Sequence, residues 1–428
     1  MQDREAGEAT TRIGFREFVG LMAALMATQA IPIDAMLPAL PAIARTLGID
    51  DENHGQWIIT AYFVGLASGQ LCWGVLSDRF GRRPMLLLAL ALYVLAAVLC
   101  GLATSFTSLL VWRAVHGLAA AGIVVVRSII RDLYSGRHMA RVMSLCFIVF
   151  LMVPVIAPSL GQLALLIAPW RHIFLLFGTF GAVVGVWTLL RLPETLHPEF
   201  RRTMHLAPLW SATRLVLGTR LSICYTLAQM TLFGTLVSYL GMVQQIFNTV
   251  YQRPALMPTV FALCAIAVGC TSFLNSRFVE RFGMRTISHA GLLAFIAISA
   301  VHVVVALAHA EPLWLFVVLQ SGTLAAFGLG LSNFMAMAME PLGSVAGIGA
   351  ALQGFVSQFF AALIGALIGR QFNGTLVPLA GGALLCGLAS LGFVLLAERG
   401  RLFRAHHTDD HLTANGAHGA ALSTVDPH

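Results

Sequence analysis

Long apolar stretches alternate with short polar connections along almost the whole chain. Each stretch has about 20 residues or more, the length that an α-helix needs to cross a hydrocarbon core about 30 Å thick. Gly, Pro and charged residues separate the stretches. The pattern predicts twelve membrane-spanning helices, over residues 17–43, 56–76, 84–104, 107–131, 140–168, 171–191, 220–247, 255–275, 286–308, 312–338, 344–370 and 374–397.

The composition supports an integral membrane protein. Hydrophobic residues make up 58% of the 428 positions and charged residues only 11%, with a mean hydropathy of +0.83. A soluble domain carries about 25% charged residues. This excludes soluble enzymes, nucleic-acid binders and disordered proteins. The seven Cys are scattered through apolar stretches without a CxxC pair, so neither a disulfide framework nor a metal site is expected.

The arginines indicate the orientation in the membrane. All 26 basic residues are Arg, and the twelve predicted spans place 21 of them on one side and 4 on the other. Because basic residues accumulate on the cytoplasmic side of membrane proteins, both termini are expected in the cytoplasm. The net charge of +7 then marks the cytoplasmic face, and we expect no nucleic-acid partner. The four arginines of the other side are Arg45, Arg171, Arg253 and Arg370.

The chain divides into two similar halves. The connection 191–219 is the longest and most polar internal segment. The sequence Asp-Arg-Phe-Gly-Arg-Arg at 78–83 recurs as Glu-Arg-Phe-Gly-Met-Arg at 280–285, at equivalent places in the two halves. We therefore expect an N-terminal six-helix bundle (1–190), a cytoplasmic linker (191–219), a C-terminal six-helix bundle (220–397) and a disordered cytoplasmic tail (398–428). Repeated halves with a substrate site between them are typical of transporters. A membrane enzyme or receptor would need a nucleophile, a metal cluster or a soluble domain, and the sequence shows none, so we expect no enzyme.

Two charged residues lie deep in predicted spans. Asp34 is about 25 Å from the cytoplasmic end of the first helix, and Arg113 is about 27 Å from that end of the fourth. A charge at the centre of a membrane helix costs roughly 2.5–3.5 kcal/mol on insertion scales, so each needs a partner, a water-filled cavity or a function. Burial favours the neutral acid and a nearby Arg favours its anion, which suits Asp34 to carry a proton. The alternative is a static ion pair between the two.

The segment Gly74–Pro84 is the most specific motif. Gly81 permits a tight turn, and Pro84 suits the first turn of the third helix. Asp78 is placed to reach the positive N-terminal end of the eleventh helix, near residues 343–347, and to join the halves on the cytoplasmic side. The remaining members are Arg79, Arg82 and Arg83. Polar residues in the spans are candidates to line a substrate cavity, or alternatively to join helices; they are Tyr62, Tyr225, Gln229, Tyr239, Asn333 and Gln353.

These motifs resemble the major facilitator superfamily, and within it the Bcr/CflA branch of multidrug drug:proton antiporters. Gly74–Pro84 matches the signature loop of the superfamily. Asp34 lies in IDAMLPALPAIA, similar to the acidic first-helix motif, with Met36 where an aromatic residue is common. Arg113 lies in WRAVHGLAAA, similar to the fourth-helix motif linked to proton transfer, with His116 in place of the usual Gln. Also similar are Arg127, Arg131 and Asp132, the antiporter motif with Pro154, Pro158 and Gly161, and Leu192–Leu196.

The resemblance implies a major facilitator fold and a secondary active transporter. We expect proton-coupled antiport that exports small amphipathic compounds or drugs across the inner membrane by alternating access, and hence multidrug efflux and antibiotic resistance. Asp34 and Arg113 would couple the proton, the Gly74–Pro84 motif would gate the cytoplasmic side, and Arg127, Arg131 and Asp132 would be gate partners. No cofactor is expected, since the proton gradient supplies the energy, and the protein is expected to be a monomer. The alternative is a proton-coupled exporter or symporter of a native metabolite, such as a sugar or amino acid derivative.

Overall fold

The computed structural model describes residues 13–49, 52–197, 199, 213–309 and 311–403. Within these ranges the regular structure is helical, and twelve spans are long and apolar enough to cross a membrane. The predicted all-α, twelve-span, multi-pass fold is thus confirmed. Residues 404–428 of the tail that the sequence predicts to be disordered, and about half of the predicted linker (198 and 200–212), lie outside the described residues, so those domain boundaries remain predictions.

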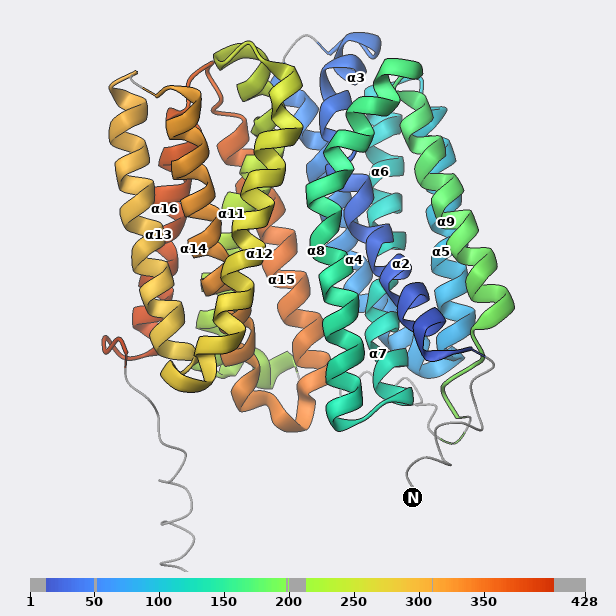
Figure 1. Cartoon of the computed structure of the whole chain (residues 1–428). Coiled ribbons are helices and arrows are strands. Elements are labelled where there is room, and N and C mark those ends of the chain that lie inside the picture. Colours follow the sequence, from blue (N-terminus) through green and yellow to red (C-terminus); the bar gives the residue numbers. More distant parts are fainter. Residues whose placement is uncertain (1–12, 50–51, 198, 200–212, 310, 404–428) are drawn as a thin grey trace, which may run out of the picture.

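The helices form two bundles that stand side by side (Figure 1). The N-terminal bundle comprises α2 (Phe15–Asp34) with α3 (Leu40–Thr46), α4 (Trp57–Phe80), α5 (Arg82–Gly101), α6 (Phe106–Ala120) with α7 (Ile123–Leu133), α8 (Gly136–Ile167) and α9 (Arg171–Arg191). The C-terminal bundle comprises α11 (Arg220–Gln245), α12 (Met257–Phe282), α13 (Met284–Leu307), α14 (Leu313–Met339), α15 (Ala346–Gly369) and α16 (Val377–Ala397). The first and fourth spans are each built from two helices in sequence.

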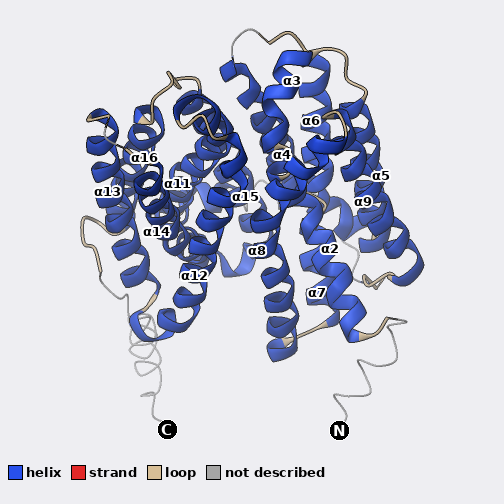
Figure 2. Ribbon diagram, turned by 45° about the horizontal axis from the view of Figure 1, so that its top comes forward, coloured by secondary structure: helices blue, strands red, loops and turns tan. Residues whose placement is uncertain are grey.

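The two bundles meet along two helix pairs. Helix α4 packs against α15, and α8 packs against α12, so the interface runs through the middle of the molecule (Figures 1 and 2). On the outer helices, large apolar side chains are exposed: Leu95 is 52% exposed, Val304 67% and Leu190 73%. An apolar outer surface of this extent fits contact with lipid rather than water.

The turns at the two ends of the spans define two faces. Helix α2 begins and α16 ends at the face that also holds the α4–α5 and α12–α13 turns, here named the arginine-rich face. Gly81 and Gly283 make these two turns with φ of 102° and 79°, a conformation that favours glycine, so the repeat in the sequence is also a repeat in the backbone. Helix α4 extends to Phe80, beyond its predicted end at 76, and most of the Gly74–Pro84 motif is therefore helical.

Candidate functional site

A break in the first span surrounds Asp34. Pro32 removes a backbone donor inside α2, and the helix ends at Asp34. A short 3₁₀ turn with Pro38 near its start follows, and then α3 with Pro41 near its start. The break leaves carbonyl groups without helical partners. Asp34 itself is 5% exposed, so its carboxyl lies inside the bundle.

The antiporter motif packs against this break. Pro154 and Pro158 lie inside α8, and Gly161 follows one turn later. A Cβ atom on Gly161 would overlap the carbonyl oxygen of Ala35 and lie 2.8 Å from its carbon. Only a glycine permits this approach of two backbones, so the structure brings the fifth-span motif directly beside Asp34.

Arg113 is fully buried on α6 and is held by backbone carbonyls. Its Nη2 atom donates to the oxygen of Pro32 at 3.2 Å, and its Nε atom donates to the oxygen of Ile58 at 3.4 Å. The guanidinium lies over the ring of Tyr62, 4.4 Å from the centroid, and also faces Phe174 at 5.7 Å. The carbonyl freed by the break in α2 therefore helps to hold the buried cation.

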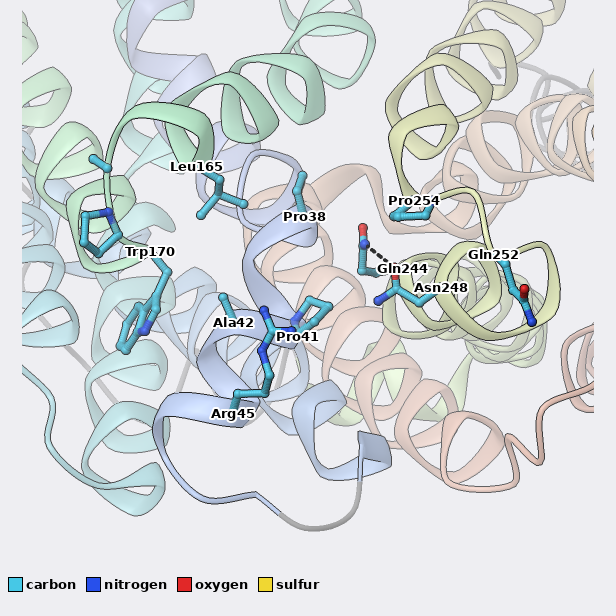
Figure 3. Close-up of a pocket in the computed structure, with 12 residues that line it drawn as sticks. Pro38, Pro41, Ala42, Arg45, Leu165, Trp170, Gln244, Asn248, Gln252 and Pro254 are labelled. Carbon is cyan, nitrogen blue, oxygen red and sulfur yellow. Dashed lines mark hydrogen bonds between the residues drawn. The ribbon is translucent and has the colours of Figure 1, made fainter.

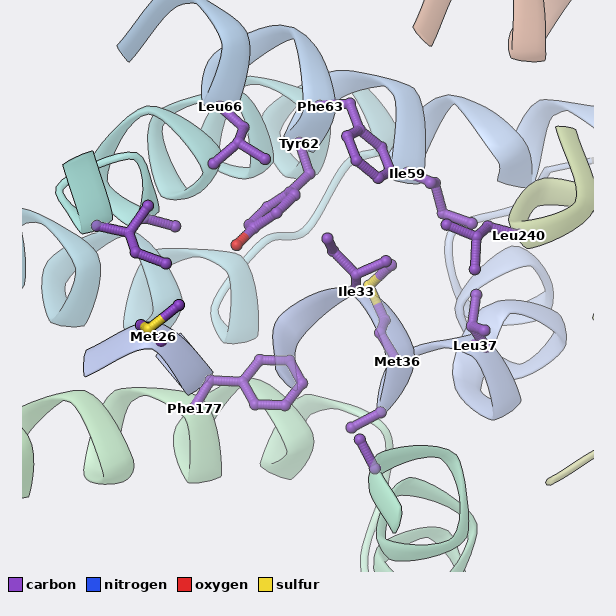
Figure 4. Packing of buried hydrophobic residues seen from close by; sticks show 14 of the residues in the cluster. Met26, Ile33, Met36, Leu37, Ile59, Tyr62, Phe63, Leu66, Phe177 and Leu240 are labelled. Atoms are coloured by element: carbon purple, nitrogen blue, oxygen red, sulfur yellow. The ribbon is translucent and has the colours of Figure 1, made fainter. Parts of the chain in front are cut away.

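Asp34 and Arg113 share a neighbourhood, as their predicted depths imply, but no ion pair joins them among the described residues. Tyr62 is close enough to interact electrostatically with both. Its hydroxyl donates to the carbonyl of Gln29 at 2.8 Å. Figure 4 shows its ring packed among apolar side chains from α2 and α4, including Ile33. The static ion pair is thus not the arrangement in this structure.

His116 adds an unsatisfied polar group to the cluster. Because a guanidinium only donates, the 3.4 Å contact with Nη1 of Arg113 makes Nδ1 of His116 the acceptor and places the ring proton on Nε2. Nε2 is buried and has no partner among the described residues. The hydroxyl of Tyr93 is also buried without a partner there, and its ring centroid lies 4.4 Å from that of His116.

The gate motif forms an ionic cluster at the arginine-rich face. The side chain of Arg82 is 5% exposed, pairs with Asp78, and donates to Asp132 at 2.9 Å and to Ser77 at 2.9 Å. The predicted partnership of the motif with Asp132 is therefore present. Asp78 pairs with Arg82, and among the described residues it makes no bond to the start of α15, where the sequence places its partner.

Glu194 completes this cluster. Its carboxylate accepts from the backbone N–H groups of Arg82 at 2.9 Å and Arg83 at 3.2 Å, which satisfies two donors at the start of α5. The Leu192–Leu196 motif thus acts as a helix cap.

The remaining gate residues surround this cluster. Arg127 and Arg131 lie exposed on α7, and Gly74, Arg79 and Pro84 lie on α4 and α5 around the turn.

Amide side chains join the two bundles at the opposite face. Nε2 of Gln56 donates to Oε1 of Gln245 at 2.9 Å and to the oxygen of Gly369 at 3.0 Å. Asn53 donates to the oxygen of Phe372 at 3.1 Å and accepts from Gln245 at 3.2 Å. We name these residues (Asn53, Gln56, Gln245, Gly369 and Phe372) the amide lock.

The amide lock was not among the residues singled out from the sequence. Its one sequence signal is the run of amides Gln244, Gln245, Asn248 and Gln252 at the end of a span. The other hydrogen bond between side chains of the two bundles in the described part of the chain joins Gln70 to Gln358 at 2.7 Å. The side-chain hydrogen bonds between the two bundles are therefore made by uncharged amides, mainly at the face opposite the arginine-rich one.

Most of the proposed cavity residues connect helices in this structure. Gln353 donates to Gln229 at 2.8 Å, and Asn333 donates to Asn275 at 2.9 Å, in each case between neighbouring helices of the C-terminal bundle. This corresponds to the alternative interpretation, in which polar residues join helices.

The other two proposed cavity residues in the C-terminal bundle, Tyr225 and Tyr239, are in separate buried surroundings. Tyr225 donates to Glu398 at 2.7 Å and contacts His289 at 3.1 Å, and Arg285 donates to the same carboxylate at 2.9 Å. This buried cluster lies at the arginine-rich end of the C-terminal bundle. Tyr239 is buried and stacks on Phe261 with centroids 5.8 Å apart.

Comparison with known proteins identifies the family. The sequence profile of the Major Facilitator Superfamily matches residues 18–366. Similar proteins include a bicyclomycin resistance protein homolog of Haemophilus influenzae, 27% identical over 81% of this chain and 87% of the relative. Multidrug resistance protein MdtL of Klebsiella pneumoniae is 29% identical over 86% of this chain and 93% of the relative. These relatives support the resemblance to the Bcr/CflA branch.

Solved structures share the fold. A peptide transporter POT in complex with sulfate has a TM-score of 0.70 at 15% identity, covering 94% of this chain and all of the other. The D-xylose-proton symporter has a TM-score of 0.68 at 14% identity, covering 90% and 99%. With the family profile over more than three quarters of its length, this chain is a membrane transporter, not an enzyme, and it belongs to the Major Facilitator Superfamily.

Proposed function

We propose that the protein is a proton-coupled antiporter that exports small amphipathic compounds, drugs among them, across the inner membrane by alternating access. The observation that carries the proposal is the buried Asp34 at the break of α2, where Arg113 donates to the carbonyl of Pro32 and Gly161 of the antiporter motif packs against Ala35. The proton gradient is the energy source, and no cofactor takes part. The protein works as a monomer in the lipid bilayer.

The coupling rests on the unusual place of Asp34. A carboxyl group in the middle of a bundle is costly as an anion, and it remains neutral until a cation or water reaches it. Arg113 supplies a cation whose present partners are neutral carbonyl oxygens. A displacement of α2 relative to α6 that exchanged a carbonyl for the carboxylate would link protonation of Asp34 to the arrangement of the helices.

The proposed direction of transport, export, is supported by the names of the relatives. With the arginine-rich face in the cytoplasm, both termini are cytoplasmic and the amide lock closes the outer side between the bundles. The names of the relatives, bicyclomycin resistance and multidrug resistance, support export of drugs.

Transport in proteoliposomes that contain a pH-sensitive dye tests the coupling. The probes are ethidium as a cation and chloramphenicol as a neutral amide. An inside-acidic gradient should drive uptake of at least one probe and alkalinise the lumen in exchange. Asp34→Asn should abolish both signals, whereas Glu199→Gln, the same change from acid to amide at an exposed position, should leave them intact.

The alternative, symport of a native metabolite, gives the opposite result. Uptake driven by an outside-acidic gradient, with protons entering alongside the solute, would replace antiport by symport. Proton-coupled transport that persists in Asp34→Asn would reject Asp34 as the proton carrier.

A further inference from the structure

A cavity of about 610 Å³ opens between the bundles at the face opposite the arginine-rich one (Figure 3). It lies beside the amide lock, because Gln244 lines the cavity and its chain neighbour Gln245 belongs to the lock. Both bundles contribute walls, from α3 and the end of α8 on one side and from the end of α11 on the other. Its volume falls within the range of sites for small molecules.

The two walls differ in chemistry. The wall from the N-terminal bundle presents Pro38, Pro41, Leu165 and Trp170, together with Arg45, which is the only charged residue among the described residues of the lining. Figure 3 shows Trp170, Ala42 and Arg45 on one side and the amides on the other. An apolar surface with one cation favours a neutral or anionic ligand with an apolar part.

The opposite wall is a row of amides. Gln244, Asn248 and Gln252 follow one another at intervals of four residues. The segment Ile246–Val250 between them is a π-helix, a rare form that is frequent at functional sites. Figure 3 shows Asn248 directed from this wall toward Pro41.

One of these amides has an unsatisfied atom. Gln244 is 5% exposed, and its Nε2 donates to Oδ1 of Asn248 at 3.1 Å. Its Oε1 has no donor among the described residues. Buried polar atoms are nearly always paired. Oε1 is enclosed in this arrangement, and rotation of the Gln244 side chain, which lines the cavity, would bring this acceptor to a donor supplied from the cavity.

We propose that this cavity is a binding site for a small amide-containing molecule, neutral or anionic, with an apolar part of its own. An amide supplies the donor that Gln244 lacks and an acceptor for the N–H groups of Asn248. The apolar part packs against the wall of prolines and Trp170, and a carboxylate, where present, pairs with Arg45. The site lies on the outer side of the amide lock in the proposed orientation, where an exported compound leaves, and in that respect it rests on the proposed function.

The test uses three dansyl probes of similar size, each with a sulfonamide N–H as the donor: dansylglycine (anion), dansylglycinamide (neutral, with a carboxamide as well) and dansylethylenediamine (cation). Binding to the purified full-length protein is measured by dansyl fluorescence and equilibrium dialysis without a proton gradient. The anion and the neutral probe should bind saturably and about fivefold more tightly than the cation. Asp34→Asn should bind them as the original protein does, so failed binding and failed proton coupling are separate results.

Variants of the two walls test the assignment of residues. Gln244→Leu should weaken binding of the anion and the neutral probe by about fivefold, the effect of one hydrogen bond. Gln244→Glu keeps acceptor oxygens but adds a negative charge, so it should reverse the preference toward the cation. Arg45→Gln should weaken binding of the anion alone. Matched controls on the same face that do not line the cavity, Arg370→Gln and Gln371→Leu, should change nothing.

Energy transfer from tryptophan to the dansyl group locates the probe. Trp170→Phe should lower the transfer more than Trp314→Phe, because Trp170 lines the cavity and Trp314 is exposed at the start of α14. The proposal is overturned if the cation binds as tightly as the anion, if Gln244→Leu binds like the original protein, or if both tryptophan variants reduce the transfer equally.

Discussion

Gly369 keeps space for the amide of Gln56, and an alanine there should open the amide lock. A Cβ atom on Gly369 would overlap Oε1 of Gln56 and lie 2.6 Å from its Cδ. The amide must then rotate away, with loss of its hydrogen bonds to Gln245 at 2.9 Å and to the carbonyl of Gly369 at 3.0 Å. Gly241 lines the same space, where a Cβ atom would lie 3.3 Å from Oε1, so the amide has little room elsewhere.

The size of the effect follows from the two lost bonds. Each buried hydrogen bond contributes about 0.5–1.5 kcal/mol net, so the closed arrangement loses about 1–3 kcal/mol relative to one in which the bundles separate at this face. That corresponds to a shift of about 5- to 150-fold in the ratio of closed to open molecules. Alanine also favours the helix over glycine, but α15 is helical in both arrangements, so this gain cancels.

Distances between spin labels measure this ratio. Labels at Leu102→Cys and Trp314→Cys, both strongly exposed, report the separation of the bundles at this face once the exposed Cys72 and Cys270 are replaced by serine. Gly369→Ala should move the distribution toward longer distances.

Matched variants show whether the lock is responsible. Gly381→Ala is the same change in α16, where a Cβ meets nothing within 4 Å, and it should leave the distribution unchanged. Gln56→Ala should reproduce the shift, and the double variant with Gly369→Ala should shift no further, because both remove the same bonds. An unchanged distribution in Gly369→Ala, or an additive double variant, would refute the reasoning.

Three further changes test the remaining parts of the site. Arg113→Lys keeps the charge but lacks the planar fork that reaches the carbonyls of Pro32 and Ile58 from fixed positions, and we expect at least tenfold slower proton-coupled transport in the proteoliposome assay with normal folding. Gly161→Ala places a methyl group against the carbonyl of Ala35 and should lower stability by about 1–3 kcal/mol in thermal unfolding, whereas Gly269→Ala, in open space, should not. Glu194→Ala removes the cap of α5 and should cost about 0.5–2 kcal/mol in the same measurement; a melting temperature equal to that of the original protein would contradict the cap.

The sequence predicts the features that depend on local chemistry. Twelve spans follow from the length of apolar stretches, and the turns at Gly81 and Gly283 follow from one residue type with a conformational preference. The pairing of Arg82 with Asp132 is also foreseeable, because a charged motif at a helix end needs a partner at the same face.

The amide lock could not be predicted in this way. Gln56 and Gln245 are 189 residues apart, and glutamine near the end of a span is ordinary. Gly369 matters because the side chain of Gln56, from the other bundle, occupies the space that a Cβ atom on residue 369 would need. Such contacts depend on how the two bundles dock, which the periodicity of a single helix does not contain.

The contacts of Asp34 and Arg113 could not be predicted from the sequence either, although both residues lie in one bundle. These contacts matter for the proposed mechanism. Counting residues along two helices gives their depth, but the rotation of each helix and the break at Pro32 decide which atoms meet. In this structure the break offers Arg113 a carbonyl two residues before Asp34, so the cation is satisfied without the acid. A buried Arg that depended on Asp34 would hold it as a permanent anion, with no reason to take up a proton. An Arg with carbonyl partners leaves Asp34 able to be neutral in one arrangement and paired in another, which is what coupling a proton to a conformational change requires.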